Sequence, residues 1–502
     1  MAKLCLCLTA PTIEEDLQVL ERYRSMIDLV ELRVDFLKPE EYFYIRRFPE
    51  FARIPTILTV RRFSDGGQFK EGEAVRLVII AKALAFASND KSKNFSYVDI
   101  EHDMYAPALQ EATRTFGTKV IRSYHAHRFP QNIDEIWKKL TANHIEIPKL
   151  SVLTESVKDT TKILQYFSSR PKGEHRIIVG MGSYGFCTRI LTDITGSMLM
   201  YASAADAGLP LAAPGQLDPE ILIKIYRVNQ NIIHKRIYGI IGSTAVINSL
   251  SPYFHNAGFS VCDENAVYLP FPTDTVEDFF ALADFLKIHG FSVTVPHKEK
   301  IIQHLNDVSP EVREIGACNT VIKTKQGFVG YNTDGFGFEK AITEFIGSSD
   351  LSSMRMSIIG AGGAARAIAY VVHKLGGEAC IINRNMNKAR KLAETYGFPW
   401  AGITEHAVNL VNEYNDLIVQ ATPVGMNGGE PGDPLEWYDF KGTEMVFDTI
   451  YSPAETQMLE RARKAGCRTM NGLSMLKWQA VAQFELFTDK KYPEINIYSI
   501  MQ

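Results

Sequence analysis

Short apolar runs alternate with longer amphipathic segments along the first half of the chain. Each run has the length of a strand and ends at a turn signal or a charged group. Eight strand–helix units within about 220 residues predict an α/β fold, a (β/α)8 TIM barrel, whereas an open doubly wound sheet would use fewer strands. The eight runs are Lys3–Thr9, Leu29–Asp35, Ile54–Arg61, Tyr97–Asp103, Lys119–Ala126, Pro148–Leu153, His175–Gly182 and Leu209–Gly215.

Ionisable residues stand at the ends of several of these runs, where barrels of this kind carry their chemistry. Lys149 lies in the apolar run PKLSVL, one run after His125 and two runs after Glu101. Its stem could simply cover apolar surface while its amine reaches water. The alternative is a desolvated amine with a lowered pKa that forms a Schiff base, with His125 beside it and Glu101 orienting the imidazole. Strand alternation predicts that His102 and His127 face the other way, as structural or solvated residues.

The runs ELRVD, YVDIE, SYH, PKLSV and APGQ resemble type I 3-dehydroquinate dehydratase. The resemblance implies that Lys149 forms an imine with the substrate ketone and that His125, positioned by Glu101, moves the proton and helps expel water. It also implies that Arg189 holds the substrate carboxylate and that four residues bind hydroxyls and close the site: Glu31, Arg33, Arg61 and Gln216. A class I aldolase-like barrel would share the lysine but would not predict the APGQ loop.

One position departs from that family. The family usually has SAPGQ, and this chain has Ala212 in place of the serine. A hydroxyl contact to the substrate is therefore expected to be missing, which would weaken binding and leave the chemistry in place.

In the second half, a strand-like run after Met356 leads into GAGGAA and then into a helix-like run. This is the GxGxxG/A pattern in its strand–turn–helix context, which predicts a Rossmann lobe that binds a dinucleotide. The turn and the helix N-terminus favour the approach of a pyrophosphate. The residues expected there are Gly360, Ala361, Gly362, Gly363 and Ala364.

The end of the next strand bears on the choice of cofactor. It reads Asn383-Arg384-Asn385, with Lys388 one turn on, and carries no carboxylate for a ribose 2′-hydroxyl. Two cations suit a 2′-phosphate, so NADP is favoured over NAD. The plainer interpretation of Arg384 and Lys388 is a solvated helix start, although cations are unfavourable there without a nearby anion.

Other segments of the second half look ordinary when taken singly. Asn332–Gly335, Ser251-Pro252 and Asn471–Ser474 could each be only a turn or a helix cap. Together with their neighbours they resemble shikimate dehydrogenase over residues 237–490. The motifs are SLSPYFHN, VTVPHK, GACNTV, GYNTDG, GAGGAAR, NRN, ATPVGM, IYSP and NGLSML.

The resemblance implies a catalytic pair, in which Lys298 passes a proton at the reacting carbon, NADPH supplies hydride and Asp334 holds the lysine in place. Ser249 and Ser251 would bind the substrate carboxylate. The remaining substrate site would comprise Thr294, Asn319, Tyr451 and Gln479, and the cofactor site would add Thr422, Gly472 and Met475, with Met475 bordering the nicotinamide. Four positions depart from the family's usual residues: Thr244, Asn248, Lys388 and Gln420.

The resemblances divide the chain into a barrel at 1–228 and a two-lobed α/β reductase. The substrate lobe is expected at 237–340, completed by about 475–502, and the Rossmann lobe at 345–474. Residues 231–236 would be a short linker.

The composition limits the classes of partner and the compartment that are expected. The chain has 54 basic and 58 acidic residues among 502, so no bulk basic field favours nucleic acid. No run approaches the roughly 18 apolar residues of a membrane span, and no leader pattern stands at the start. Seven scattered cysteines without a CxxC pair indicate neither a metal site nor a disulfide framework, which fits a reducing cytoplasm.

The leading hypothesis is a bifunctional enzyme of the shikimate pathway, because the product of the first half is the substrate of the second. It would convert 3-dehydroquinate to 3-dehydroshikimate and then to shikimate with NADPH. One alternative is a second half that acts on quinate with NAD. Another is a catalytically silent ligand-binding regulator. The oligomeric state is left open.

Overall fold

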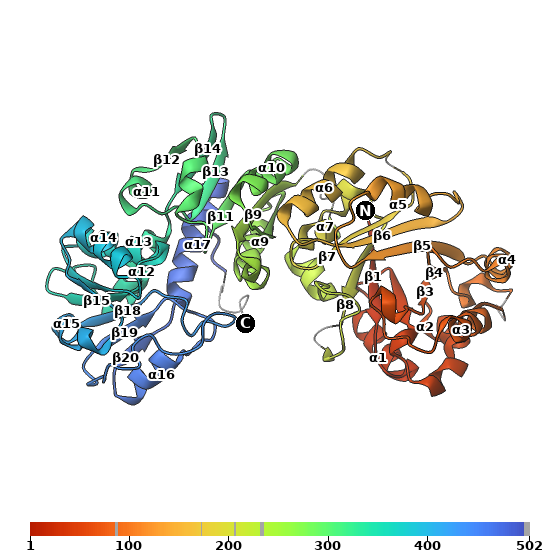
Figure 1. Ribbon diagram of the computed structural model, residues 1–502, viewed down its shortest axis with the longest axis horizontal. Helices are drawn as coiled ribbons and strands as arrows, with labels where there is room; N and C mark the ends of the chain where they lie inside the picture. The colour runs from red at the N-terminus through yellow and green to blue at the C-terminus, as the bar shows by residue number, and fades with distance from the viewer. Residues whose placement is uncertain (86–88, 172, 205–206, 231–234, 496–502) are drawn as a thin grey trace. The chain divides into compact units, whose positions relative to one another are not determined.

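The computed structural model describes residues 1–85, 89–171, 173–204, 207–230 and 235–495 (Figure 1). It divides into two compact units. The first comprises Met1–Arg236 and Asn265–Lys287, and the second comprises Ile237–Glu264 and Ile288–Gln502. The predicted domain bounds stay predictions, since most of the linker at 231–236 and the end of the segment 475–502 lie outside the described residues.

Eight parallel strands form the core of the first unit, in the order β7-β6-β5-β4-β3-β2-β1-β8. A parallel bridge between Arg176 and Ser197 joins the two outer strands, so the sheet is nearly closed and the predicted barrel is confirmed. The strands are β1 (Lys3–Leu8), β2 (Leu29–Arg33), β3 (Thr56–Thr59), β4 (Tyr97–Glu101), β5 (Lys119–Ala126), β6 (Ile147–Leu153), β7 (Ile177–Met181) and β8 (Leu199–Ser203).

Alternating side chains of these strands build two cores. Cys5, Ile57, Ile121 and Ile177 pack with one another inside the barrel. Leu150 and its neighbours face outward against helices such as α5 and α6. The helices of this unit are α1 (Ile13–Tyr23), α2 (Phe48–Ala52), α3 (Glu73–Ala85), α4 (Pro107–Phe116), α5 (Ile133–Leu140), α6 (Val157–Ser168), α7 (Phe186–Ile190), α8 (Thr192–Thr195) and α10 (Val276–Leu286).

The predicted eighth strand was wrong. Leu209–Gly215 is a loop, and the strand is the buried run Leu199–Ser203 that precedes it. Pro210 and Pro214 explain the difference, because proline has no N–H to donate to a β-ladder. The predicted segment instead becomes the loop that follows β8.

A second sheet is six-stranded and mixed, in the order β10-β9-β11-β13-β14-β12. Strand β11 runs parallel to β9 and antiparallel to β13. Its strands are β9 (Arg236–Gly242), β10 (Ala266–Pro272), β11 (Gly290–Val293), β12 (Asp307–Val308), β13 (Thr320–Thr324) and β14 (Gly327–Tyr331). Its helices are α9 (Ser251–Val261), α11 (Pro310–Ile315), α12 (Asp334–Ile346) and α17 (Leu473–Thr488), and α12 packs against α17.

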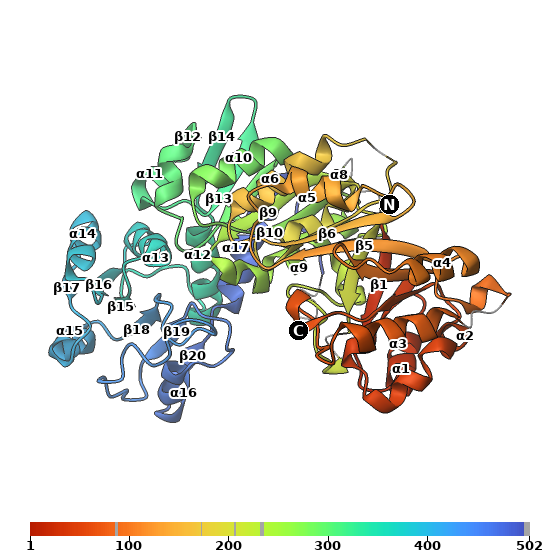
Figure 2. The same cartoon turned by 45° about the vertical axis from the view of Figure 1, so that its right-hand side comes forward.

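The second lobe is a parallel sheet in the order β17-β16-β15-β18-β19-β20. Numbered along the lobe this is 3-2-1-4-5-6, the order of dinucleotide-binding sheets, which confirms the predicted Rossmann lobe. Successive residues Ile358 and Ile359 of β15 enter different hydrophobic cores on the two faces of the sheet. Figure 2 shows the ribbon of this lobe with its strands and helices labelled. The strands are β15 (Arg355–Ile359), β16 (Glu378–Ile382), β17 (Trp400–Ala401), β18 (Leu417–Gln420), β19 (Met445–Asp448) and β20 (Arg468–Met470). The helices are α13 (Gly363–Lys374), α14 (Met386–Tyr396), α15 (Val408–Glu413) and α16 (Gln457–Lys464).

Within the described part of the chain, none of the helices has both the length and the apolar character that crossing a membrane requires.

Candidate active sites

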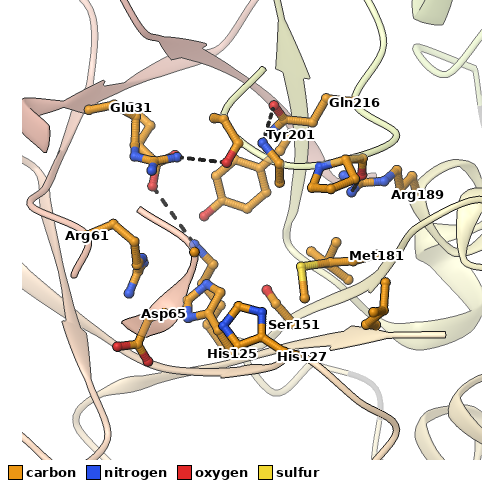
Figure 3. Close-up of a pocket in the computed structure, with 18 residues that line it drawn as sticks. Glu31, Arg61, Asp65, His125, His127, Ser151, Met181, Arg189, Tyr201 and Gln216 are labelled. Carbon is orange, nitrogen blue, oxygen red and sulfur yellow. Dashed lines mark hydrogen bonds and ion pairs between the residues drawn. The ribbon is translucent and has the colours of Figure 1, made fainter. Parts of the chain in front are cut away.

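A pocket of about 290 Å³ lies at the C-terminal ends of the barrel strands (Figure 3). The lining residues come from β2, β5, β6, β7, β8 and α7 and from the loops after β3, β5 and β8. Seven of the eight predicted barrel residues line it: Glu31, Arg33, Arg61, His125, Lys149, Arg189 and Gln216. The structure also adds lining residues that the sequence did not single out, among them Asp65, Ser151, Met181 and Tyr201, and it adds His127, which was expected to face away.

The amine of Lys149 is held by acidic side chains inside the barrel. Its Nζ donates to Asp99 Oδ2 at 2.8 Å and lies 3.9 Å from Glu31 Oε1. The other Asp99 oxygen pairs with Arg61 Nη2 at 2.7 Å. Burial by itself would raise the pKa of Asp99, but Arg61 and Lys149 outweigh it and hold that pKa below its usual range. Asp99 therefore stays ionised beside the lysine.

Sequence reasoning missed Asp99, although a signal was present. Asp99 lies two residues before Glu101 in β4, so strand alternation points both carboxylates into the barrel. Only the second of them was singled out.

The predicted role of Glu101 differs from what the structure shows. Its two oxygens accept from Arg61 Nη1 and from Arg76 Nη1, each at 2.6 Å. The imidazole of His125 has no hydrogen-bond partner at its buried Nδ1 among the described residues. Buried guanidinium groups bind a carboxylate more strongly than a neutral imidazole does, so Glu101 pairs with the arginines instead of orienting His125.

The two histidines near the end of β5 both line the pocket. Burial, together with the positive charges of Arg61 and Lys149, lowers the pKa of His125, so the ring is neutral and can accept a proton. His127 was expected to face away. Strand β5 ends at Ala126, so alternation no longer fixes the next side chain, and the His127 ring contacts the carbonyl of Ser64 at 3.0 Å.

Arg189 is the buried cation of this pocket that has no acidic partner within 4.0 Å among the described residues. It is 6% exposed, its Nη2 donates to the carbonyl of Pro214 at 2.7 Å, and its Nε has no partner. Burial lowers its pKa to about 10. Arg33, by contrast, binds Asp35 through two nitrogens. Arg189 is therefore available to an anionic ligand.

Side-chain contacts hold the loop after β8 against strands β1 and β2. Arg33 Nη1 donates to the carbonyl of Ala212 at 3.1 Å. Gln216 Nε2 contacts Cys7 Sγ at 3.3 Å, and Cys7 Sγ contacts Glu31 Oε2 at 3.2 Å. These contacts place Gln216 and Glu31 in the same wall.

The predicted reductase pair is in direct contact in the second unit. Lys298 Nζ lies 2.5 Å from Asp334 Oδ2, and Asp334 is the first residue of α12. Asn319 Nδ2 donates to Asp334 Oδ1 at 2.9 Å and to Gln479 Oε1 at 3.2 Å. Gln483, which the sequence did not single out, donates to Gln479 Oε1 at 3.1 Å. Five side chains from four separate segments therefore form one polar cluster, since Gln479 and Gln483 share α17.

The other predicted substrate residues lie at ends of strands and helices. Ser251 begins α9, and its N–H donates to Ser249 Oγ at 3.1 Å. Thr294 directly follows β11 and packs so closely on Gly242 that a Cβ there would lie 2.5 Å from its methyl group. Tyr451 lies beyond β19, and burial raises its pKa.

The glycine turn after β15 leaves room for a dinucleotide. Gly360 has a φ of +126°, and a Cβ on it would lie 2.8 Å from the carbonyl oxygen of Ala421. A Cβ on Gly362 would meet no atom within 4 Å, whereas one on Gly363 would lie 2.9 Å from the Lys298 side chain. Space above Gly362 at the N-terminus of α13 suits a pyrophosphate, and the turn lies against the predicted catalytic lysine.

Exposed cations lie at the predicted 2′-phosphate position. The Arg384 side chain is 81% exposed and lies 3.1 Å from Glu430 Oε2. Asn385 caps α14 by accepting from the N–H of Lys388 at 3.1 Å, and Asn383 Nδ2 donates to the carbonyl of Asn385. A phosphate there would compete with a single carboxylate for Arg384.

The remaining predicted cofactor residues are positioned by backbone contacts. Gln420 Nε2 donates to the carbonyls of Thr422 and Val424 and so shapes the loop after β18. Gly472 precedes α17, where a Cβ would lie 2.0 Å from a carbonyl oxygen, and Met475 is buried in the adjoining core.

The folds and sites define a barrel enzyme with a buried lysine joined to a two-lobed, dinucleotide-dependent reductase. Residues 4–233 match a family described as type I 3-dehydroquinase, and residues 240–321 match the shikimate dehydrogenase substrate binding domain. Residues 355–428 match a family described as NADP oxidoreductase, coenzyme F420-dependent.

Several known proteins are similar to the chain. The bifunctional 3-dehydroquinate dehydratase/shikimate dehydrogenase of Arabidopsis thaliana, named as chloroplastic, is 29% identical over 495 residues, covering 94% of this chain and 80% of its own. The NADP(+) shikimate dehydrogenase of Thermococcus kodakarensis is 38% identical over 261 residues, covering 52% of this chain and 93% of its own. A crystal structure of the Listeria monocytogenes shikimate 5-dehydrogenase with shikimate and NAD has 31% identity and a TM-score of 0.49, covering 54% of this chain and 97% of its own.

The chain therefore belongs to the shikimate dehydrogenase family, with a type I 3-dehydroquinase as its first half, and is a bifunctional, NADP-dependent enzyme of the shikimate pathway.

Proposed function

We propose that the barrel dehydrates 3-dehydroquinate through an imine on Lys149 and that the second unit reduces the product, 3-dehydroshikimate, at Lys298 and Asp334. The observation that carries the first part is a buried lysine amine in a pocket that also holds a neutral imidazole and an arginine without an acidic partner. A cyclic keto acid offers a carbonyl for the amine and a carboxylate for Arg189.

The dehydration follows from these groups. Lys149 Nζ attacks the ketone carbon, and loss of water gives the imine. His125 takes a proton from the neighbouring carbon, and the adjacent hydroxyl leaves as water after accepting a proton. Hydrolysis of the imine releases 3-dehydroshikimate and restores the amine. Glu101 contributes indirectly, because its Oε1 accepts a hydrogen bond of 2.6 Å from Arg61 Nη1 and so keeps Arg61 in place.

Binding of the substrate is assigned to the groups around these two residues. Arg189 holds the carboxylate through its guanidinium fork. Glu31, Arg33, Arg61 and Gln216 face the same pocket and bind hydroxyls or close it.

The reduction uses the second cluster. Bound NADPH supplies hydride to the carbonyl carbon of 3-dehydroshikimate. Lys298 gives a proton to the oxygen at that carbon, and Asp334, 2.5 Å away, keeps the ammonium in position. Ser249 and Ser251 take the carboxylate, while Asn319 and Gln479 bind hydroxyls. Thr294 and Tyr451 complete the substrate site.

The turn Gly360–Ala364 would hold the cofactor pyrophosphate, and Arg384 and Lys388 would bind its 2′-phosphate. Thr422 and Gly472 would complete the cofactor site, and Met475 would border the nicotinamide. A second half that prefers quinate and NAD is the remaining alternative. Comparing kcat/KM for the oxidation of shikimate with NADP(+) against that of quinate with NAD(+) decides between them, and a higher value for the quinate pair would overturn the assignment.

Trapping with borohydride tests the imine directly. The protein is incubated with 3-dehydroquinate and borohydride, and the adduct is located by mass spectrometry. A label on Lys149 is expected. Turnover without a label at Lys149 would exclude the Schiff-base route, and absence of any turnover in either half would favour a silent ligand-binding regulator.

Single substitutions separate the two halves. Lys149→Ala should abolish dehydration and leave reduction of 3-dehydroshikimate intact, while Lys298→Ala should have the opposite effect. Each variant serves as the folding control for the other.

The site of action proposed is the cytoplasm, and the partners proposed are the small-molecule substrates, with neither nucleic acid nor membrane among them. All seven cysteines are free thiols and six of them are buried, which fits a reducing compartment. Fractionation of the source cells tests this, and recovery of the protein from an organelle would contradict it.

A further inference from the structure

Tyr201 of β8 has a hydroxyl group that forms no hydrogen bond with the described residues. The residue is 6% exposed and lines the barrel pocket. Lys149 Nζ lies 4.5 Å from the centre of its ring. Its oxygen is buried and has no hydrogen-bond partner among the described residues. Figure 3 shows this hydroxyl turned toward the middle of the pocket.

Such a hydroxyl adds nothing to the fold through the described residues. A phenol whose oxygen none of these residues bonds stabilises the protein no more than a phenyl ring does. Phenylalanine would fill the same space and keep the ring over Lys149. A tyrosine is therefore explained by a hydrogen bond that forms when a ligand fills the pocket.

A second feature of the same pocket is a hydroxyl group that its loop lacks. The loop after β8 resembles SAPGQ but has Ala212 where the serine is usual, so the loop offers no hydroxyl there. Ala212 and Tyr201 both line the pocket. The phenol can therefore make the contact that the loop lacks.

We propose that Tyr201 donates a hydrogen bond from its phenol to an oxygen of the bound polyhydroxylated keto acid, in place of a serine at position 212. This rests on the proposed function of the barrel and adds a substrate-binding residue to it. Burial raises the pKa of Tyr201, so the phenol keeps its proton and acts as a donor throughout the working range of pH.

Tyr201→Phe tests the proposal, because it removes only the hydroxyl. The kcat/KM for 3-dehydroquinate should fall about tenfold, mainly through KM, as expected for one lost hydrogen bond to substrate. The melting temperature of the ligand-free protein should stay unchanged or rise, because an unpaired buried hydroxyl has been removed. A kcat/KM within about twofold of the unsubstituted protein would overturn the proposal.

A second substitution separates the hydroxyl from packing. Ala212→Ser added to Tyr201→Phe should restore most of kcat/KM, because it returns a hydroxyl to the pocket wall. Failure of the double variant to recover would show that the loss came from packing, and would overturn the proposal.

Tyr166→Phe is the matched control. Its hydroxyl donates to Asp134 Oδ1 at 2.8 Å outside the pocket. This change should lower the melting temperature slightly and leave KM unaltered, the opposite pattern from Tyr201→Phe. Borohydride trapping at saturating substrate should label Lys149 in every variant. Loss of that label in the unsubstituted protein would refute the barrel mechanism itself, whereas equal labelling with unchanged KM would refute only the role of Tyr201.

Discussion

Lys149 on β6 forms a buried ion pair with Asp99 on β4, with 2.8 Å between Nζ and Oδ2. Strand β5 lies between them in the sheet, so the pair spans two strand spacings across the barrel interior. Asp99 also holds Arg61, and each of the three side chains is at most 6% exposed. The lysine therefore begins its reaction from a position that is fixed by the charge of Asp99.

Asp99→Asn should weaken the positioning of Lys149. The amide keeps the size of the side chain but removes the charge that holds Nζ at 2.8 Å. The rate of borohydride trapping with 3-dehydroquinate should therefore fall about tenfold or more. Asp103→Asn, at an exposed carboxylate bonded to Arg62, is the control and should leave the trapping rate in place. An unchanged trapping rate in Asp99→Asn would show that the carboxylate does not position the amine.

The neutral state of His125 has a consequence for stability. Its pKa is lowered in the folded protein, whereas the unfolded chain takes up a proton at this residue below about pH 6.5. The unfolded state binds more protons there, so the folded state loses stability as pH falls through 6.5. His125→Gln should remove this loss, and its free energy of unfolding should decline less than that of the unsubstituted protein between pH 7 and 5. His102→Gln, at an exposed histidine, controls for the loss of an imidazole. If the free energy of unfolding declined in parallel with pH in His125→Gln and in the unsubstituted protein, the prediction would be contradicted.

Gly362→Ala should separate cofactor binding from folding. The new methyl group would meet no protein atom within 4 Å, so thermal unfolding should be unchanged. It would occupy the space assigned to the pyrophosphate, so KM for NADPH should rise about tenfold or more. The dehydratase activity of the same molecule is the internal control. Normal KM for NADPH would place the pyrophosphate elsewhere.

Glu430 should act as a competitor of the cofactor 2′-phosphate. Its carboxylate lies 3.1 Å from Arg384, in an exposed pair worth little to stability. Glu430→Gln should therefore lower KM for NADPH a few-fold and leave KM for NADH unchanged, while Arg384→Ala should raise KM for NADPH alone. Equal effects on NADPH and NADH in both variants would mean that Arg384 does not read the phosphate.

The local pattern of the chain predicted most of the architecture. Alternation and turn signals placed the first seven barrel strands, and Lys119–Ala126 agrees at both ends. The GAGGAA turn predicted the strand–turn–helix of the Rossmann lobe, because glycine is required where the backbone must leave space for phosphates. The eighth strand failed since an apolar run interrupted by prolines resembles a strand in composition but cannot complete a ladder.

For the first seven strands, the sequence by itself determined which side chains face the barrel interior, because alternation is a property of each strand alone. It could not decide the partners that those charges choose. Glu101 was expected beside His125 and instead binds Arg61 and Arg76, while Asp99 takes Lys149. Which cation each carboxylate binds depends on which strands come together around the barrel interior. It also depends on the small number of acidic groups that this interior offers to its buried cations. The hydroxyl of Tyr201, which no described residue bonds, could likewise not be predicted from the sequence, because a missing partner is recognised only when the positions of all the neighbours are known.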